Sequence, residues 1–189
     1  MKKSKEAFRD YLQLEKNYSP HTVNAYWNDI SFFESYIKEI FEQDNLQEIN
    51  YSQIRSWIVS LVDDGIANSY INKKIASLKA FYKFLLKTKE IQVSPLLKHK
   101  ALKTSKKVQI PFSEAEVATV LDDLFFEKDF EGTRNKLIIE LFYATGIRRI
   151  ELVELKLLSF DLDAKTLKVL GKRNKERIVP LLDSVINAL

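Results

Sequence analysis

Apolar residues recur at three- and four-residue steps through most of the first ninety positions, which is the spacing of amphipathic helices. The pattern predicts four helices, at about 4–16, 19–40, 51–63 and from about 68 onward. Ser19 followed by Pro20 gives the second helix a capping hydroxyl and a proline at its first position. These helices predict one compact helical domain.

A second domain is predicted to follow a break in the pattern at residues 93–95. Residues 98–111 are rich in lysine and weakly periodic, which predicts an exposed linker. Ser113 and Glu116 have the spacing of a capping box and open a helix. We therefore expect domains at 1–97 and 112–189. Within the second, helices are predicted at 114–126, 133–144 and 148–156.

The character of the chain changes after these helices. Residues 167–170 and 177–180 alternate as short strands around a polar turn at 172–175, which predicts a β-hairpin. A helical pattern begins again at Asp183. The expected fold class is mainly α, with a four-helix domain followed by an α+β portion that holds a small antiparallel β-sheet.

Composition excludes several classes of protein. The chain has no cysteine, two histidines and four scattered glycines. Disulfides, thiolate nucleophiles, zinc clusters and Gly-rich phosphate loops are therefore not expected. Neither a signal peptide nor an apolar run long enough to span a membrane is present, which favours a cytoplasmic protein. We expect no metal, no cofactor, no membrane partner and no small-molecule substrate.

The net charge of +4 is unevenly distributed. Residues 68–107 hold eleven lysines and one acidic residue, whereas residues 114–131 hold seven acidic residues and one lysine. This polarity favours one surface that meets a polyanion such as nucleic acid. The alternative is a lysine-rich helix face that only contacts water.

Two basic segments carry candidate chemistry. Arg148 and Arg149 follow Gly146 at the start of a predicted helix, where guanidinium and free backbone N–H groups can bind a phosphate. Glu151 lies three residues after Arg148 and can orient it across one turn. Residues 171–177 place four cations at a hairpin tip, within reach of a nucleic-acid groove. The alternatives are a structural Arg–Glu pair and a solvated basic turn.

Together these segments resemble a known family. The string ATGIRRIEL, followed about twenty residues later by SFDLDAKTLKVLGKRNKERIVPL, is similar to the motifs of tyrosine recombinases of the Xer and phage integrase type. Residues 8–32 and 72–85 resemble that family's SAM-like core-binding domain. The departures are Arg149-Ile150, where the family has small or apolar residues, and Arg173, where glycine is common.

The resemblance implies roles for individual residues. Arg148 is the first catalytic arginine, Lys172 the general acid at the leaving 5′ oxygen, and Glu151 a supporting residue. The partner is double-stranded DNA, clamped by both domains, and no cofactor is needed. The expected DNA contacts lie on the second and fourth helices, in the linker and near the catalytic motifs: His21, Thr22, Asn24, Asn72, Lys73, Lys74, Ser77, Lys106, Lys107, Arg149, Arg173 and Lys175.

The family also uses a His/Lys-x-x-Arg segment and a nucleophilic tyrosine beyond the lysine hairpin. All eight tyrosines of this sequence precede Arg148. The resemblance therefore implies a fragment that binds DNA and does not cleave it, and that joins other recombinase subunits only in a full-length tetramer. Chromosome-dimer resolution and mobile-element integration both remain open. So do two other classes of protein, a non-catalytic helical DNA-binding or accessory protein and a helical protein-interaction scaffold.

Overall fold

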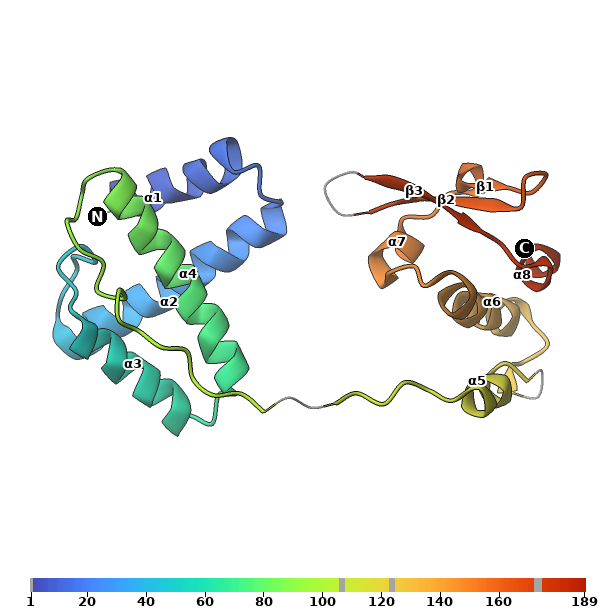
Figure 1. The fold of residues 1–189 in the computed structure, drawn as a ribbon, viewed down its shortest axis with the longest axis horizontal. Coiled ribbons are helices and arrows are strands. Elements are labelled where there is room, and N and C mark those ends of the chain that lie inside the picture. Colours follow the sequence, from blue (N-terminus) through green and yellow to red (C-terminus); the bar gives the residue numbers. More distant parts are fainter. Residues whose placement is uncertain (1, 106–107, 123–124, 172–174) are drawn as a thin grey trace. The chain divides into compact units, whose positions relative to one another are not determined.

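The computed structural model describes residues 2–105, 108–122, 125–171 and 175–189. The chain forms two compact units, Met1–Lys107 and Val108–Leu189 (Figure 1). Each unit has its own cluster of buried apolar side chains. Among the described residues no helix combines the length and the apolar character needed to cross a bilayer.

The first unit is helical and matches the predicted pattern closely. Its elements are α1 (Lys2–Asp10), the π-helical turn η1 (Tyr11–Glu15), α2 (Pro20–Phe41), α3 (Tyr51–Asp63) and α4 (Asn68–Lys87). The Ser19 side chain accepts a hydrogen bond from the Thr22 N–H, and Pro20 occupies the first turn, so the predicted start of α2 is confirmed. The helix predicted at 4–16 is continuous but changes to π-helical winding at Tyr11.

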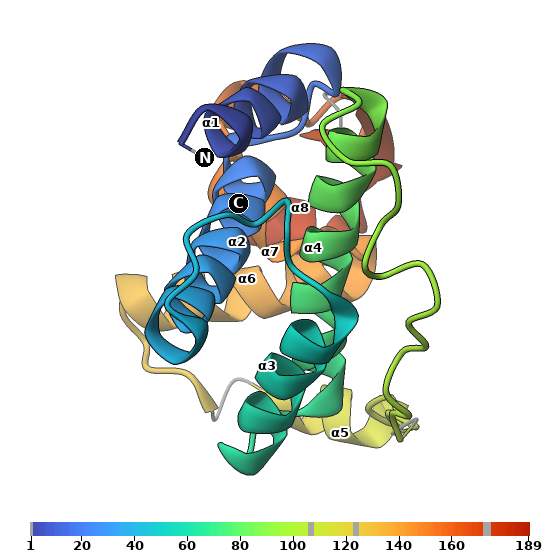
Figure 2. The ribbon, with the colours of Figure 1, turned by 90° about the vertical axis from the view of Figure 1, so that its left-hand side faces the viewer.

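The core of this unit lies where α2, α3 and α4 meet. Figure 2 shows α2 and α4 side by side, with α3 against both. Trp57 is fully buried and its ring lies 4.9 Å from that of Phe33. Tyr82 is also buried, and its hydroxyl donates to the Leu46 carbonyl oxygen. Burying side chains of this size stabilises a fold by roughly 1.5–3 kcal/mol each, so α2–α4 form the rigid part of the unit.

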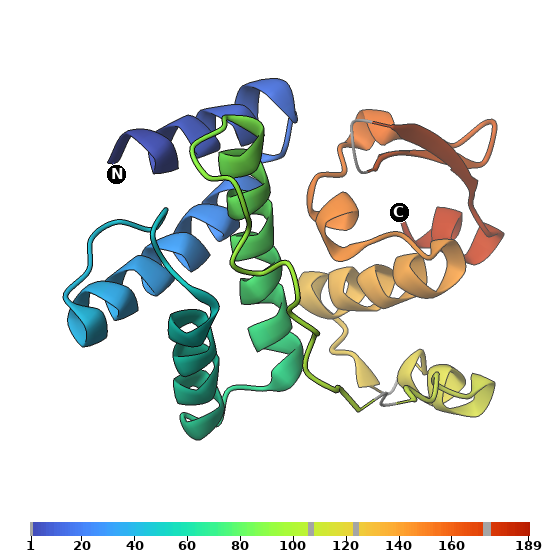
Figure 3. The ribbon, with the colours of Figure 1, turned by 60° about the vertical axis from the view of Figure 1, so that its left-hand side comes forward.

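The chain after α4 turns back along that helix, where the sequence predicted an exposed linker from residue 98 (Figure 3). The Asn72 side-chain amide donates to the Leu102 carbonyl oxygen and accepts from the Leu102 N–H, both at 2.9 Å. Asn68 donates to the carbonyl oxygen of Lys103. His99 is 8% exposed, and Leu102 packs against the helical core. We call residues 99–103 the return segment. Side-chain hydrogen bonds to an irregular backbone leave no periodic signal, which is why the pattern missed it.

The second unit combines helices with a small sheet. Its elements are α5 (Glu114–Val120), α6 (Phe130–Thr145), α7 (Arg149–Val153), the 3₁₀ turn η3 (Leu157–Ser159), β1 (Phe160–Asp161), β2 (Thr166–Leu170), β3 (Glu176–Pro180) and α8 (Asp183–Ala188). The sheet is antiparallel in the order β1-β2-β3, with Leu167 paired to Val179. The predicted hairpin strands are confirmed, and β1 is an addition.

Alternation along β2 sets the core of this unit. Leu167 and Val169 are fully buried, while Lys168 between them is exposed and pairs with Glu176 at 2.8 Å. Leu141 of α6 and Val185 of α8 belong to the same apolar cluster. Leu152 of α7 packs against the same cluster, which joins α7 to the sheet within the unit.

Helix lengths in the second unit differ from the prediction in both directions. The capping box of Ser113 and Glu116 is confirmed, but α5 ends at Val120 rather than near 126. An acidic residue such as Asp122 is unfavourable near a helix C-terminus, where the macrodipole is negative. α6 begins three residues earlier than predicted, because the Asp129 side chain accepts from the Gly132 N–H at 2.7 Å.

Candidate functional site

The first candidate site forms where α6 ends and α7 begins. Gly146 closes α6 with φ of +60°, a conformation that suits glycine. The chain then turns at once into α7, with Arg148 as its N-cap residue. The Arg148 side chain is 57% exposed. An exposed guanidinium is suited to an anion such as phosphate.

Glu151 is the buried centre of this site. Its side chain is 2% exposed, and its carboxylate accepts from both the backbone N–H and the guanidinium of Arg148, at 2.8 and 2.9 Å. Two further hydrogen bonds, at 2.8 and 2.7 Å, come from the Arg177 guanidinium on β3. The hydrogen bonds from Arg177, followed by that from the Arg148 backbone, hold the pKa of Glu151 well below its ordinary value. The carboxylate therefore stays charged and tied to two elements.

The base of the β2–β3 hairpin meets the same carboxylate. A Cβ atom at Gly171 would lie 3.4 Å from Glu151 Oε1 and 3.3 Å from Arg177 Nη1, so glycine leaves room for the pair. The Gly171 N–H donates to the Lys175 carbonyl oxygen at 2.7 Å and closes the base of the hairpin. The predicted site residues Lys172 and Arg173 lie outside the described residues, and Lys175 is exposed.

Arg177 is the residue that the sequence reasoning missed. The sequence pattern presents it only as one of several cations in a basic turn. The structure instead pairs its guanidinium with a carboxylate twenty-six residues earlier. The available signal was the strand alternation, which places Arg177 opposite Val169 in register and on the inward face of the hairpin.

The predicted DNA contacts of the first unit gather along a groove between α2 and α4. The groove encloses about 540 Å³ and is lined by side chains from both helices, including His21, Asn24, Lys73, Lys74 and Ser77. Of these five, His21, Asn24 and Lys73 are exposed. Thr22 contacts the capping residue Ser19 at the start of α2. The arrangement presents amide, imidazole and ammonium groups on one face.

Two of the groove's predicted contacts serve the packing of α2 against α4. Lys74 pairs with Asp29 at 3.1 Å with only 12% of its side chain exposed, and its ammonium lies over the Phe32 ring. Ser77 is buried and donates to the same Asp29 at 2.6 Å. Hydrogen bonds from α4 to one carboxylate of α2 thus fix the two walls of the groove.

Other predicted DNA contacts lie elsewhere. The Asn72 side chain holds the return segment, so the structure gives it an internal partner. Lys106 and Lys107 lie outside the described residues. Arg149 is exposed in the first turn of α7. The structure therefore brings His21, Asn24, Lys73, Lys74 and Ser77 together on one groove, and Arg148 with Glu151 in another site.

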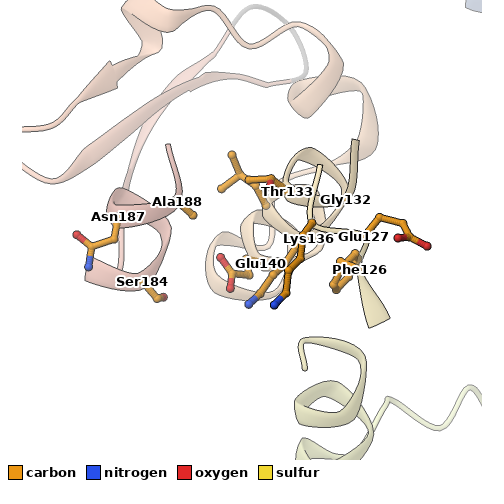
Figure 4. Close-up of a pocket in the computed structure, with 11 residues that line it drawn as sticks. Phe126, Glu127, Gly132, Thr133, Lys136, Glu140, Ser184, Asn187 and Ala188 are labelled. Atoms are coloured by element: carbon orange, nitrogen blue, oxygen red, sulfur yellow. The ribbon is translucent and has the colours of Figure 1, made fainter. Parts of the chain in front are cut away.

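A separate pocket in the second unit contains none of the predicted residues. It encloses about 620 Å³ beside the first turns of α6 and against α8 (Figure 4). Lys136 and Glu140 of α6 and Ser184 and Asn187 of α8 line it. Its lining carries charges of both signs, among them Lys136 and Glu140.

Comparison with known proteins assigns both units to one family. Residues 6–89 match the phage integrase N-terminal SAM-like domain, and residues 124–189 match the phage integrase family. The tyrosine recombinase XerC of Anoxybacillus flavithermus is 37% identical over 177 residues, which cover 92% of this chain and 57% of that protein. XerC of Staphylococcus carnosus is 33% identical over 181 residues, covering 95% and 60%. The chain spans less than two thirds of the length of these curated relatives.

Solved structures share the fold. The Tn1549 transposon integrase in complex with transposon right end DNA is similar with a TM-score of 0.76 at 17% identity, covering 98% of this chain and 63% of that one. The lambda integrase, in a tetramer bound to a Holliday junction, gives 0.73 at 16% identity, covering 97% and 52%. These likenesses agree with the sequence matches: the chain belongs to the phage integrase family of tyrosine recombinases.

Proposed function

We propose that this chain is the part of a site-specific tyrosine recombinase that grips duplex DNA and presents the first catalytic arginine to the scissile phosphate. The observation that carries the proposal is the exposed Arg148 guanidinium, held at a helix N-terminus by the buried Glu151. A cation fixed in this way stabilises developing phosphoryl charge without reorganising. The XerC relatives are named tyrosine recombinases, and the Tn1549 integrase was solved with DNA, which supports duplex DNA as the substrate.

The chemistry follows from the family. A tyrosine hydroxyl attacks the phosphorus, forms a 3′-phosphotyrosyl bond and expels the 5′ oxygen, which takes up a proton. Arg148 neutralises the non-bridging oxygens as charge builds on them. Lys172 supplies the proton, a task suited to an amine whose pKa responds to its surroundings. The bond energy stays in the phosphotyrosine, so rejoining needs no cofactor.

The DNA grip is proposed for the groove between α2 and α4, together with the lysines of the return segment. His21, Asn24 and Lys73 are exposed on the groove, and Lys100 and Lys103 are exposed on the return segment. If about six cations neutralise phosphates, the logarithm of the affinity for a duplex should fall with the logarithm of salt concentration at a slope of about −5. Fluorescence anisotropy across a salt series measures this slope, and a flat response would contradict the proposal.

The catalytic role of Arg148 needs an active enzyme. We suggest joining these 189 residues to the remaining C-terminal part of the A. flavithermus XerC and testing strand cleavage on its recombination site. In an active chimera, Arg148→Ala and Lys172→Ala should each abolish cleavage and retain most DNA affinity. Cleavage at the parent rate by either variant would reject its assigned role. Arg134→Ala, an exposed arginine of α6, is the control.

We further propose that these 189 residues alone bind DNA without cutting it. Seven of the eight tyrosines fall in the first unit, and the buried Tyr82 donates its hydroxyl to a backbone carbonyl. Tyr143 is 58% exposed on α6. Incubation with a nicked duplex should give no covalent protein–DNA adduct on a denaturing gel. An adduct that disappears in Tyr143→Phe would contradict the proposal and identify the nucleophile.

A further inference from the structure

We propose that Arg177 is a positioning residue for phosphate binding. It neutralises the buried Glu151 carboxylate, which orients Arg148. The three side chains therefore keep one net positive charge, which Arg148 offers to a phosphate. The proposal rests on the proposed function and assigns a role to a residue outside the catalytic pair. It follows from how three side chains share one site.

The first step is the geometry of the shared carboxylate. Arg177 places Nη1 on Glu151 Oε1 at 2.8 Å and Nη2 on Oε2 at 2.7 Å, which is the bidentate fork of a strong guanidinium–carboxylate pair. Arg148 places one side-chain nitrogen on Oε1 at 2.9 Å. Arg177 is thus the closer counterion, and Arg148 uses the carboxylate mainly to fix its orientation.

The second step is the charge that remains. A single Arg148–Glu151 pair would be neutral overall and would attract a phosphate weakly. Two guanidinium groups around one carboxylate leave one net positive charge. Because removal of one partner from a buried pair is costly, Glu151 needs this neutralisation for stability as well.

The third step is where the excess charge is exposed. The side chain of Glu151 is 2% exposed, that of Arg177 37% and that of Arg148 57%. Solvent, and therefore a ligand, reaches Arg148 most easily. The hydrogen bonds of Arg177 on β3 with Glu151 on α7 also join the β2–β3 hairpin to α7, and a Cβ atom at Gly171 would lie 3.3–3.4 Å from this pair.

The test uses the whole 189-residue chain and a random-sequence duplex, with the salt slope of binding as the readout. Arg148→Met should make the slope shallower by about 0.9, the loss of one phosphate contact. Arg177→Met should do the same although its side chain touches no phosphate, because Glu151 then neutralises Arg148. Arg177→Lys keeps the charge and should keep the slope.

The decisive variant is the double substitution Glu151→Gln with Arg177→Met, which removes the carboxylate and its counterion together. It should restore the wild-type slope, because Arg148 is again an uncompensated cation. A double variant that behaves like Arg177→Met alone would show that Arg177 contacts DNA itself and would overturn the inference. This variant buries no unpaired charge, and circular dichroism of each variant checks that it is folded.

The remaining outcomes separate this inference from the proposed function. If the wild-type chain shows no salt-dependent binding, the proposed function fails. If Arg148→Met changes the slope and Arg177→Met does not, the proposed function stands and the inference is wrong. If neither changes the slope, Arg148 binds no phosphate and both assignments fall.

Discussion

Single side chains of the first unit hold segments that carry no secondary structure. Asn72 is one such residue, with a hydrogen bond in each direction to the backbone of Leu102. The sequence interpretation expected Asn72 to contact DNA, because an exposed amide on a helix is suited to base edges. Because the amide of Asn72 pairs with both the backbone N–H and the C=O of Leu102, its first role is to hold the return segment against α4.

Asn72→Ala should free the return segment. Two half-buried hydrogen bonds are lost, which costs about 1–3 kcal/mol of unfolding free energy. Trypsin should then cut faster at Lys100 and Lys103, as followed by mass spectrometry. Asn68→Ala, which removes one exposed hydrogen bond to the same segment, is the matched control and should have the smaller effect. Unchanged cleavage together with weaker DNA binding would favour direct contact by Asn72.

His99 makes the first unit sensitive to acid. Burial, and then the nearby Lys79 ammonium, lower the pKa of His99 below its ordinary value of 6.5. The unfolded chain therefore binds the proton at higher pH than the folded chain does, and the unfolding free energy should fall as the pH drops below about 6.5. One group contributes at most about 1.4 kcal/mol per pH unit.

Urea unfolding at a series of pH values between 7 and 5 measures this loss. His99→Phe should flatten the profile in that range, because the variant cannot take up the proton. His21→Gln, which changes a histidine exposed on α2, is the control. The lowered pKa of Glu90, caused first by its hydrogen bond from Ser4, acts in the same direction but below about pH 4.5.

At the scale of elements, long amphipathic helices were predictable and short irregular ones were not. The bounds of α3 agree with the expected 51–63, because its apolar stripe and its Asn50 cap act together. Ile40, near the C-terminal end of α2, is 54% exposed, since the helix extends past the core. The pairing of Arg177 with Glu151 depends on how β3 packs against α7. These elements are separated in the sequence, so no local pattern predicts the contact.

At the start of α6, the backbone of Glu127 packs so closely against Gly132 that no side chain fits there. A Cβ atom there would lie 2.0 Å from the Glu127 carbonyl oxygen, a backbone atom that cannot rotate away. Gly132→Ala should therefore destabilise the second unit by about 3 kcal/mol, the upper end for overpacking. Gly65→Ala is the contrast: φ is +76° but nothing lies within 4 Å, so about 1–2 kcal/mol is expected. Thermal unfolding of both variants measures the difference, and equal losses would contradict it.

On the scale of the whole molecule, two separate cores divide the chain's stability. The first unit buries its own apolar cluster around Trp57 and Tyr82, and the second buries another around Leu167 and Val169. The lysine-rich window belongs to the first unit, whereas the acidic stretch 114–131 belongs to the second. Each unit therefore has its own hydrophobic core, and the basic and acidic stretches lie in different units.

Calorimetry should resolve two unfolding transitions. Asn72→Ala should lower only the transition of the first unit, and Gly132→Ala only that of the second. If duplex DNA binds the folded groove as proposed, and not the unfolded chain, it should raise the transition of the first unit by mass action. A single transition that both variants shift equally would show that the units unfold together.

The hydrogen bonds of Asn72 to Leu102 also determine which insertions would lengthen the connection between the two units. α4 has 20 residues and is about 30 Å long, and residues 88–103, which end in the return segment, carry the backbone from the end of α4 back to Asn68 at its beginning. The anchor from which the second unit is tethered thus lies after Lys103, not at the end of α4. Insertions between residues 88 and 95 should bulge outward without lengthening the tether. Insertions after Lys103 add their full length to it, so an engineer who wishes to alter the reach between the two halves has to work there.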